Sequence, residues 1–148
     1  MSEAAAEQAA ALVDTDVATW LILDAPHAAP WRPVLRGRVL VISFATFGEL
    51  MAFPYVKRWG ERRTQEWEAT IRRTFVVLPY NANVALIWAP MHAKLSGHLQ
   101  AKGTNDLWTA ATALASDPQL AIATNNRGDF DQIADEFDVS LLSPAADE

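Results

Sequence analysis

The sequence predicts an α/β fold in which a central parallel sheet of four to five strands is covered by helices on both faces. Short runs rich in Val, Ile and Leu alternate with longer helical segments, the order found in strand–helix–strand crossover units. Most of these short runs lack polar alternation, as do strands that are buried on both faces. The 148 residues are 51% hydrophobic and 20% charged, which is the composition of one globular domain with its own core.

The strands and helices are expected in regular succession along one domain, residues 1–148, of which the Ala-rich residues 1–10 form a frayed extension. The expected strands are residues 11–15, 38–43, 75–78, 120–124 and 139–142. The expected helices are residues 16–23, 45–53, 55–73, 81–102 and 105–115. Pro90 should kink or break the fourth helix, because proline removes a backbone hydrogen bond from a helix interior. Residues 24–37 contain three prolines and a glycine and are expected to form a loop.

Composition excludes several classes of protein. The chain has no cysteine, which excludes a disulfide scaffold and any Cys-ligated metal site. No apolar run approaches the roughly 20 residues that a transmembrane helix needs. The first sixteen residues carry acids where a signal peptide would carry bases, so we expect a cytoplasmic protein without membrane contact.

The charges are unevenly distributed within a net charge of −6. Residues 1–30 hold five acids and no base, residues 31–73 hold nine bases and four acids, and residues 74–148 hold three bases and nine acids. This pattern fits a protein that gathers carboxylates at one place and binds a polyanion beside it. Scattered, solvated surface charge is the alternative interpretation.

Acidic residues follow the predicted strands, at the sheet edge where open parallel sheets bind ligands. They are Asp14 and Asp16 after the first strand, Glu49 two turns into the next helix, Asp106 at the start of the Ala-rich helix, and Asp129 after the fourth strand. Simpler explanations exist for these acids taken singly: Asp16, Asp129, and either Asn105 or Asp106 as helix caps, and Glu49 as a solvated side chain. Gathered at one edge, however, four acids would repel one another unless a hard divalent cation such as Mg²⁺ or Mn²⁺ were bound.

Four segments of the chain, in order between residues 12 and 144, resemble the PIN-domain ribonucleases. They are VDTDV (13–17), SFATFGEL (43–50), GTNDLWTAATAL (103–114) and ATNNRGDF (123–130). The resemblance is closest to the toxin subunits of VapBC-type toxin–antitoxin pairs. It assigns the catalytic and metal-binding acids to Asp14, Glu49, Asp106 and Asp129, and supporting polar roles to Thr15, Thr124 and Asn126. Asp16 stands where the family commonly has Asn, and is either a fifth carboxylate or a different helix cap.

The resemblance implies a three-layer α/β/α fold and a metal-dependent endoribonuclease toxin. One or two Mg²⁺ or Mn²⁺ ions held by the acidic quartet would activate a water, leaving 5′-phosphate and 3′-hydroxyl ends. It also implies an RNA substrate, a cognate antitoxin and a homodimer. No serine lies in a G-x-S-x-G motif, and His27, His92 and His98 lack triad or metal-ligand spacing, which agrees with a mechanism that needs no side-chain nucleophile.

Six of the bases lie between residues 57 and 73. With Arg127, we expect this segment, notably Arg58, Arg62 and Arg63, to bind the RNA backbone. Trp59 and Trp67, eight residues apart on one predicted helix face, either stack on bases or belong to the core or a dimer interface. Some of the arginines face the antitoxin or a second subunit if the segment is an interface instead.

Three alternative functions stay open on the sequence alone. The first is a PIN-fold RNA-processing nuclease without an antitoxin, and the second is a non-catalytic PIN-fold binding module. The third is a phosphatase or receiver domain, which also carries acids at its strand ends. A receiver needs a lysine near its last strand, and no lysine follows Lys102.

Overall fold

A computed structural model describes residues 10–95, 97–99 and 105–144 of the chain. Its centre is a five-stranded sheet in the order β3-β2-β1-β4-β5, in which every strand pair is parallel. The strands are β1 (Ala11–Val13), β2 (Leu40–Ser43), β3 (Val76–Leu78), β4 (Ala121–Ala123) and β5 (Leu141–Leu142). All five predicted strands are confirmed, each shorter than expected. The strand order reverses at β1, so a switch point of the kind that binds ligands lies between β1 and β4.

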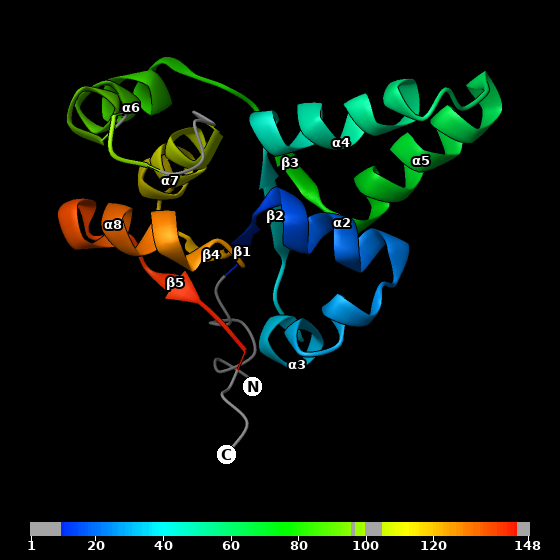
Figure 1. The fold of residues 1–148 in the computed structure, drawn as a ribbon, viewed down its shortest axis with the longest axis horizontal. Coiled ribbons are helices and arrows are strands. Elements are labelled where there is room, and N and C mark those ends of the chain that lie inside the picture. Colours follow the sequence, from blue (N-terminus) through cyan, green and yellow to red (C-terminus); the bar gives the residue numbers. More distant parts are fainter. Residues whose placement is uncertain (1–9, 96, 100–104, 145–148) are drawn as a thin grey trace.

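Helices cover both faces of the sheet, which confirms the three-layer α/β/α prediction (Figure 1). They are α2 (Thr15–Leu23), the 3₁₀ helix η1 (Pro26–Ala28), α3 (Trp31–Leu35), α4 (Phe44–Val56), α5 (Glu61–Thr74), α6 (Ala82–Leu95), α7 (Asn105–Ala115) and α8 (Arg127–Phe137). The expected loop at 24–37 was wrong, since η1 and α3 lie within it. Pro26 is the first residue of η1, a position where proline favours a helix, and Pro30 is the N-cap of α3. No helix in the described part of the chain is long and apolar enough to cross a bilayer.

Two other helix predictions are corrected. The expected helix at 55–73 is divided, because α4 continues to Val56 and α5 begins only at Glu61. Arg58 adopts a left-handed φ of 58° in the turn between them, which ends α4. Pro90 does not break α6, because Met91 and Leu95 after it and Val84 before it are all buried in the core. Residues 100–102, the end of that predicted helix, and residues 1–9 of the predicted extension lie outside the described residues.

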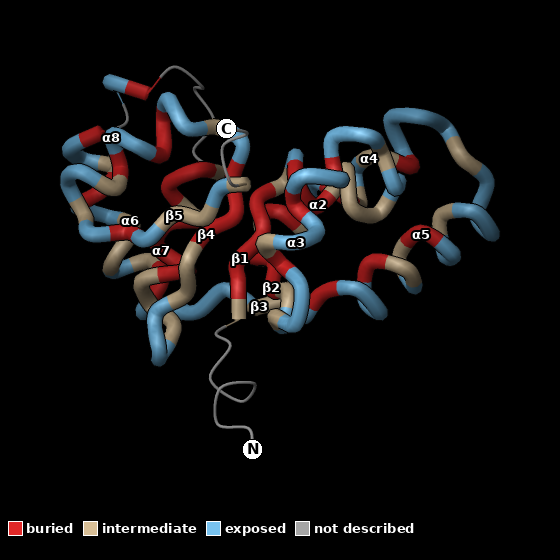
Figure 2. Tube along the Cα trace, turned by 90° about the horizontal axis from the view of Figure 1, so that it is seen from below, coloured by how far each residue is buried: buried red, intermediate tan, exposed pale blue. Residues whose placement is uncertain are grey.

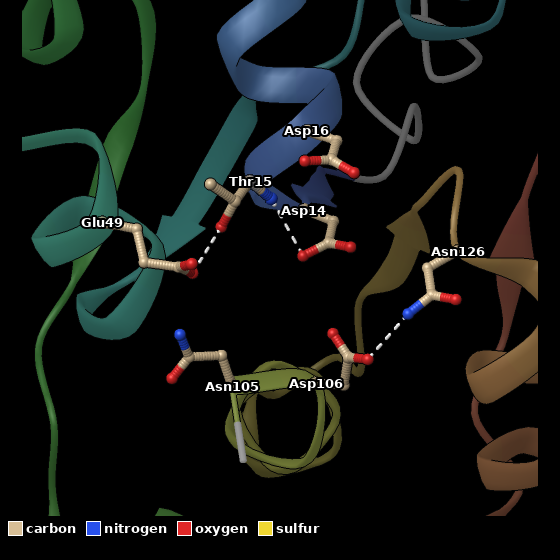
Figure 3. Close-up of a pocket in the computed structure, with 7 residues that line it drawn as sticks. All are labelled: Asp14, Thr15, Asp16, Glu49, Asn105, Asp106 and Asn126. Carbon is tan, nitrogen blue, oxygen red and sulfur yellow. Dashed lines mark hydrogen bonds between the residues drawn. The ribbon is translucent and has the colours of Figure 1, made fainter. Parts of the chain in front are cut away.

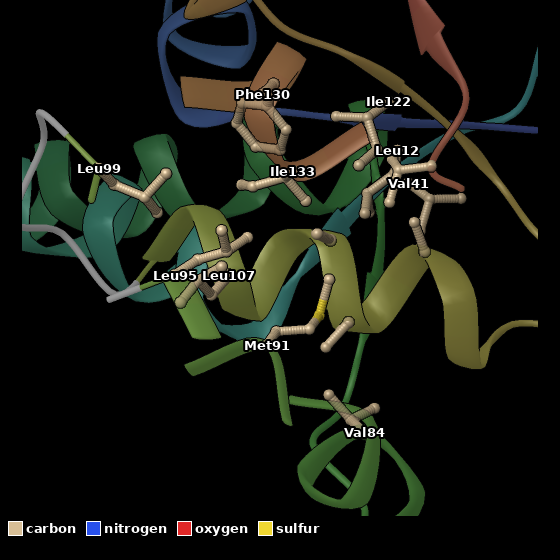
Figure 4. Packing of buried hydrophobic residues seen from close by; sticks show 14 residues of the cluster. Leu12, Val41, Val84, Met91, Leu95, Leu99, Leu107, Ile122, Phe130 and Ile133 are labelled. Atoms are coloured by element: carbon tan, nitrogen blue, oxygen red, sulfur yellow. The ribbon is translucent and has the colours of Figure 1, made fainter. Parts of the chain in front are cut away.

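Two apolar cores lie on the two faces of the sheet. Leu12, Val41 and Ile122 pack with α6, α7 and α8 (Figure 4), whereas Val13 and Ile42 pack with α2, α3, α4 and α5. Neighbouring strand residues therefore point to opposite cores, which is why the strands are apolar without alternation. Figure 2 shows the buried residues concentrated on the strands and on the inward sides of the helices.

Helices α4 and α5 extend beyond the sheet as a helical pair, which we call the α4–α5 arm (residues 44–74; Figure 1). The pair is held together by a cluster of aromatic rings. Trp67 packs against Trp59 and Phe53 with ring centroids 5.3 and 5.5 Å away, and its indole Nε1 donates a hydrogen bond to the carbonyl of Leu50. Trp59 and Trp67 thus contact each other, but across the turn and not along one helix face.

Candidate active site

A pocket of about 240 Å³ lies at the carboxyl ends of the central strands (Figure 3). We call it the acid pocket. Its walls come from the start of α2, from α4, from the start of α7 and from the segment after β4. The lining residues are Asp14, Thr15, Asp16, Glu49, Asn105, Asp106 and Asn126. Of the four predicted catalytic acids, the pocket therefore brings three together, and Asp129 does not line it.

Asp14 is the residue between β1 and α2 and is only 9% exposed. It is the N-cap of α2, and its Oδ1 accepts a hydrogen bond of 2.9 Å from the backbone N–H of Thr15. Its Oδ2 accepts a second bond of 2.9 Å from the Thr124 hydroxyl. Burial raises the pKa of Asp14, and the nearby negative charges of Asp16 and Glu49 add to that rise, whereas the two hydrogen bonds oppose it. Asp14 is therefore fixed in orientation but costly to ionise.

Glu49 enters the pocket from the second turn of α4 and is exposed. Its Oε1 accepts a hydrogen bond of 2.7 Å from the Thr15 hydroxyl, which also lies 3.1 Å from the Thr46 hydroxyl. The helix that carries Glu49 begins at Ser43, the N-cap of α4, whose hydroxyl accepts from the backbone N–H of Thr46. The end of β2 thus sets the direction from which Glu49 reaches the pocket.

Asn126 connects the remaining two acids. Its Nδ2 donates to Oδ2 of Asp106 at 2.8 Å and lies 3.4 Å from Oδ2 of Asp129. The Thr124 hydroxyl accepts from the backbone N–H of Asn126 at 3.0 Å, so one threonine positions both Asn126 and Asp14. Asp129 is 1% exposed in the first turn of α8. It therefore lies behind Asn126 and acts on the pocket through this amide and through its charge.

The electrostatics of the pocket are dominated by uncompensated negative charge. The pKa of Asp106 is raised to about 7, first by burial, then by the charges of Asp14 and Asp129 and, less, of Glu49, against the hydrogen bond from Asn126. In the described part of the chain, no arginine or lysine forms a salt bridge with Asp14, Asp16, Glu49 or Asp106. Carboxylates held together in this way favour a bound cation or a proton.

The structure corrects the helix-cap explanations for several acids. Asp14, and not Asp16, caps α2; Asp16 is exposed in the first turn. Asp106 and Asp129 likewise lie inside the first turns of α7 and α8. Asn105 lines the pocket as the first residue of α7, and the sequence had indicated it only as a possible cap. Its position next to Asp106 was the one signal that could have identified it.

The predicted RNA-binding arginines are not gathered at the acid pocket. Arg58 is in the turn between α4 and α5, and Arg62 and Arg63 are in the first turn of α5, at the end of the arm away from the sheet (Figure 1). Arg62 pairs with Glu66 at 3.3 Å, and the Arg63 guanidinium lies 3.8 Å from the ring centroid of Trp59. Arg127, by contrast, directly follows Asn126 and pairs with Asp131 at 3.0 Å.

The donor set of the acid pocket fits a hard divalent cation. Its lining side chains offer carboxylate, amide and hydroxyl oxygens and no sulfur or imidazole, and oxygen donors are what Mg²⁺ and Mn²⁺ prefer. Within the described residues, no three His, Cys, Asp or Glu side chains are already arranged as an ion site. Glu49 and Asp106 are instead bonded to Thr15 and Asn126.

Several solved structures have a similar fold. VapBC-1 from nontypeable Haemophilus influenzae is 23% identical with a TM-score of 0.70, over 89% of this chain and 96% of that one. FitAcB from Neisseria gonorrhoeae is 24% identical with a TM-score of 0.67, over 90% and 96% of the two chains. A toxin–antitoxin complex from Klebsiella pneumoniae is 20% identical with a TM-score of 0.65, over 93% and 100%. At sequence identities below 25%, these similarities show a common fold.

The sequence itself identifies the family. No curated protein matches the chain. Residues 11–136, well over half of the chain, match the PIN domain, and they include all four predicted acids. The chain therefore belongs to the PIN-domain family.

Proposed function

We propose that this chain is a metal-dependent endoribonuclease that acts as the toxin of a toxin–antitoxin pair. The observation that carries the proposal is the acid pocket, in which Asp14, Glu49 and Asp106 converge at the switch point of the sheet and, among the described residues, form no salt bridge with a lysine or arginine. The membership of the PIN-domain family supports a nuclease. A non-catalytic module would have no need to keep buried carboxylates whose ionisation is unfavourable.

Some residues of the pocket would hold a cation, and others would orient the acids that hold it. Asp14, Glu49 and Asp106 are the residues we assign to Mg²⁺ or Mn²⁺, with Asp129 contributing charge from behind. The bound ion would supply an activated water and stabilise negative charge on the phosphate. Thr124 fixes Asp14 and Asn126, and Asn126 fixes Asp106, each through the hydrogen bonds described above. Asp16 would be a peripheral charge, since it is exposed.

An antitoxin partner is supported by the similar solved structures, one of which is described as a toxin–antitoxin complex. A homodimer is also part of the proposal. The arm offers surface for one of these contacts, since Tyr55 and Val56 at the end of α4 are 73% and 76% exposed. We keep the assignment of Arg58, Arg62, Arg63 and Arg127 to the RNA backbone as a prediction.

The decisive experiment incubates the purified chain with single-stranded RNA in Mn²⁺, in Mg²⁺ and in EDTA, and maps the product ends. We expect cleavage only with a divalent ion, 5′-phosphate ends, and no cleavage by Asp14→Asn. Undiminished cleavage in EDTA, or by Asp14→Asn, would remove the basis of the proposal. Growth arrest on induction, relieved by the protein encoded beside it, would separate a toxin from a housekeeping nuclease.

A further inference from the structure

A second pocket, of about 460 Å³, shares no lining residue with the acid pocket and takes no part in the proposed chemistry. We call it the aromatic pocket. It is formed by α2, η1, α3 and the segments that follow β4 and β5. The lining residues are Trp20, Pro26, His27, Pro30, Trp31, Asn125 and Pro144. The volume is within the range of sites that bind small organic molecules.

Flat and rigid surfaces dominate this pocket. The His27 ring stacks on the Trp20 ring, with centroids 4.9 Å apart and planes 23° from parallel. Trp31 is 2% exposed and forms a fixed part of the wall, and three prolines supply further rigid apolar surface. Asn125 adds one amide, which both donates and accepts hydrogen bonds. Planar apolar surfaces with one amide suit a planar heterocycle that has both donors and acceptors on its edge.

Two chain segments contribute lining residues to both the aromatic pocket and the acid pocket. Asp16 lines the acid pocket and Trp20 lines the aromatic pocket, and these residues are one turn apart on α2, on the same helix face. Asn126 and Asn125, adjacent in the chain, likewise line one pocket each. An RNA chain bound with one phosphate at the acid pocket would therefore have a neighbouring base on the side of the aromatic pocket.

A positively charged side chain, that of Arg127, lies close to residues of both pockets. Arg127 follows Asn126 in the chain, and its Nη1 donates to the Ser143 hydroxyl at 3.3 Å, next to Pro144 of the aromatic pocket. Its side chain is about half exposed. A guanidinium at this place can contact a phosphate between the two pockets.

We propose that the aromatic pocket binds one unpaired nucleobase of the RNA, from a nucleotide next to the phosphate held at the acid pocket. The inference rests on the proposed function, because it takes RNA as the substrate. The base stacks on the His27–Trp20 pair, and the Asn125 amide bonds to the edge of the base. The pocket thus gives the nuclease a preference for single-stranded RNA and selectivity for the identity of one base near the cleavage site.

The test measures binding in Ca²⁺, a hard divalent ion that the oxygen donors of the acid pocket can hold, and each sample is checked for intact RNA so that cleavage does not interfere. The probes are a fluorescein-labelled hexamer of adenosine and a hexamer of the same ribose-phosphate backbone without bases. We expect the full chain to prefer the base-containing hexamer. His27→Ala should weaken its binding at least about fivefold, the lower end of the effect of losing one stacked base, and Asn125→Ala should also weaken it. His27→Phe, which keeps an aromatic face, should bind nearly as the wild type does.

A matched control and a separate cleavage assay make the result decisive. Leu86→Ala removes a side chain that is 72% exposed on α6, and it should leave binding unchanged. Equal binding of the two hexamers, or wild-type affinity of both His27→Ala and Asn125→Ala, would overturn the base-pocket proposal even if the wild type cleaves RNA. Base-dependent binding that these variants weaken, in a chain that does not cleave RNA with Mn²⁺, would support the base pocket and overturn the nuclease.

Discussion

The acid pocket and the α4–α5 arm differ in how their charged side chains are partnered, since most bases of the arm contact an acid, a hydroxyl or an aromatic ring of the arm itself. On α5, Arg62 and Arg72 pair with Glu66 and Glu68 at the i,i+4 spacing. Arg63 and Lys57 lie over the rings of Trp59 and Phe53. In the described part of the chain, Asp14, Glu49 and Asp106 have no such basic partners. The bases of the arm are therefore partnered within the fold, whereas the carboxylates of the acid pocket need a bound cation or a proton to offset their charge.

The largest expected effect tests whether packing holds the arm together. Trp67 is 7% exposed, contacts Trp59 and Phe53, and donates to the Leu50 carbonyl. Trp67→Ala should lower the free energy of unfolding by about 3–5 kcal/mol, measured by urea denaturation. Trp67→Phe keeps an aromatic ring but leaves the carbonyl without its donor, and should cost about 1–3 kcal/mol. A loss below about 1 kcal/mol for Trp67→Ala would mean that the cluster does not support the arm.

The second prediction concerns the charge of the acid pocket. Asp106→Asn keeps the shape of the side chain and an oxygen that can accept from Asn126, but removes one negative charge from the cation site. We expect RNA cleavage to fall by about 100-fold or more, equivalent to about 2.7 kcal/mol of activation free energy. The matched control is Asp138→Asn, an exposed change at the left-handed C-cap of α8, which should leave cleavage unchanged. Near-normal cleavage by Asp106→Asn would place the active site elsewhere.

The same substitution should stabilise the metal-free fold at neutral pH. Because the pKa of Asp106 rises from 3.8 to about 7 on folding, the folded state holds the proton more tightly than the unfolded state. The wild type therefore loses stability as the pH rises from about 4 to about 7. Asp106→Asn should show little Tm advantage at pH 4 and a clear one at pH 8, at about 2–4 °C per kcal/mol.

A divalent ion provides a check on this result that does not depend on cleavage. Mg²⁺ or Mn²⁺ binds only the folded state at this site, so it should raise the Tm of the wild type at pH 8. The rise should be smaller in Asp106→Asn, which has lost a ligand. Equal Tm values for the two proteins at every pH, with and without the ion, would show that the ionised carboxylates of the pocket do not destabilise the fold.

The strands and the pocket were predictable for the same reason, namely that both are set by local sequence. Val13 and Ile42 are apolar because each strand is buried on both faces, and Asp14 and Asp106 lie at the N-terminal ends of helices that line the pocket. The burial of Asp129 behind Asn126 depends on how α8 packs on the sheet, which no local pattern specifies.

The division of the arm had one signal in the sequence, Gly60, which is the N-cap of α5 and which glycine's low helix propensity makes unfavourable inside a helix. The end of α4 had no such signal, because its left-handed φ is adopted by Arg58, where a glycine or asparagine would have indicated a turn. Tertiary contacts of the aromatic cluster offset the free-energy cost of this left-handed conformation. The stacking of His27 on Trp20 was missed because three prolines indicated a loop, and the short helices that place these rings are stabilised by packing.

A smaller effect is expected from the arginines at the end of the arm. Replacing Arg62 and Arg63 together by Gln removes two charges that the salt bridge to Glu66 and the Trp59 ring compensate only partly. If they contact RNA, binding should weaken similarly for all sequences, and its salt dependence should fall by up to about one log–log unit per lost phosphate contact. Fluorescence anisotropy across a salt series measures both. An unchanged salt slope with loss of the dimer or of antitoxin binding would assign the arm to a protein partner instead.

The smallest effect is expected at Asp16, an exposed acid at the pocket. Its side chain is exposed in the first turn of α2, and Asp14 already caps that helix. Asp16→Asn removes a charge that favours the helix N-terminus but also one that raises the pKa of Asp14, and these two effects oppose each other. We expect the free energy of unfolding to change by less than about 0.5 kcal/mol and cleavage to stay nearly unchanged. If Asp16→Asn reduced cleavage as strongly as Asp106→Asn, Asp16 would be a metal ligand and not a peripheral charge.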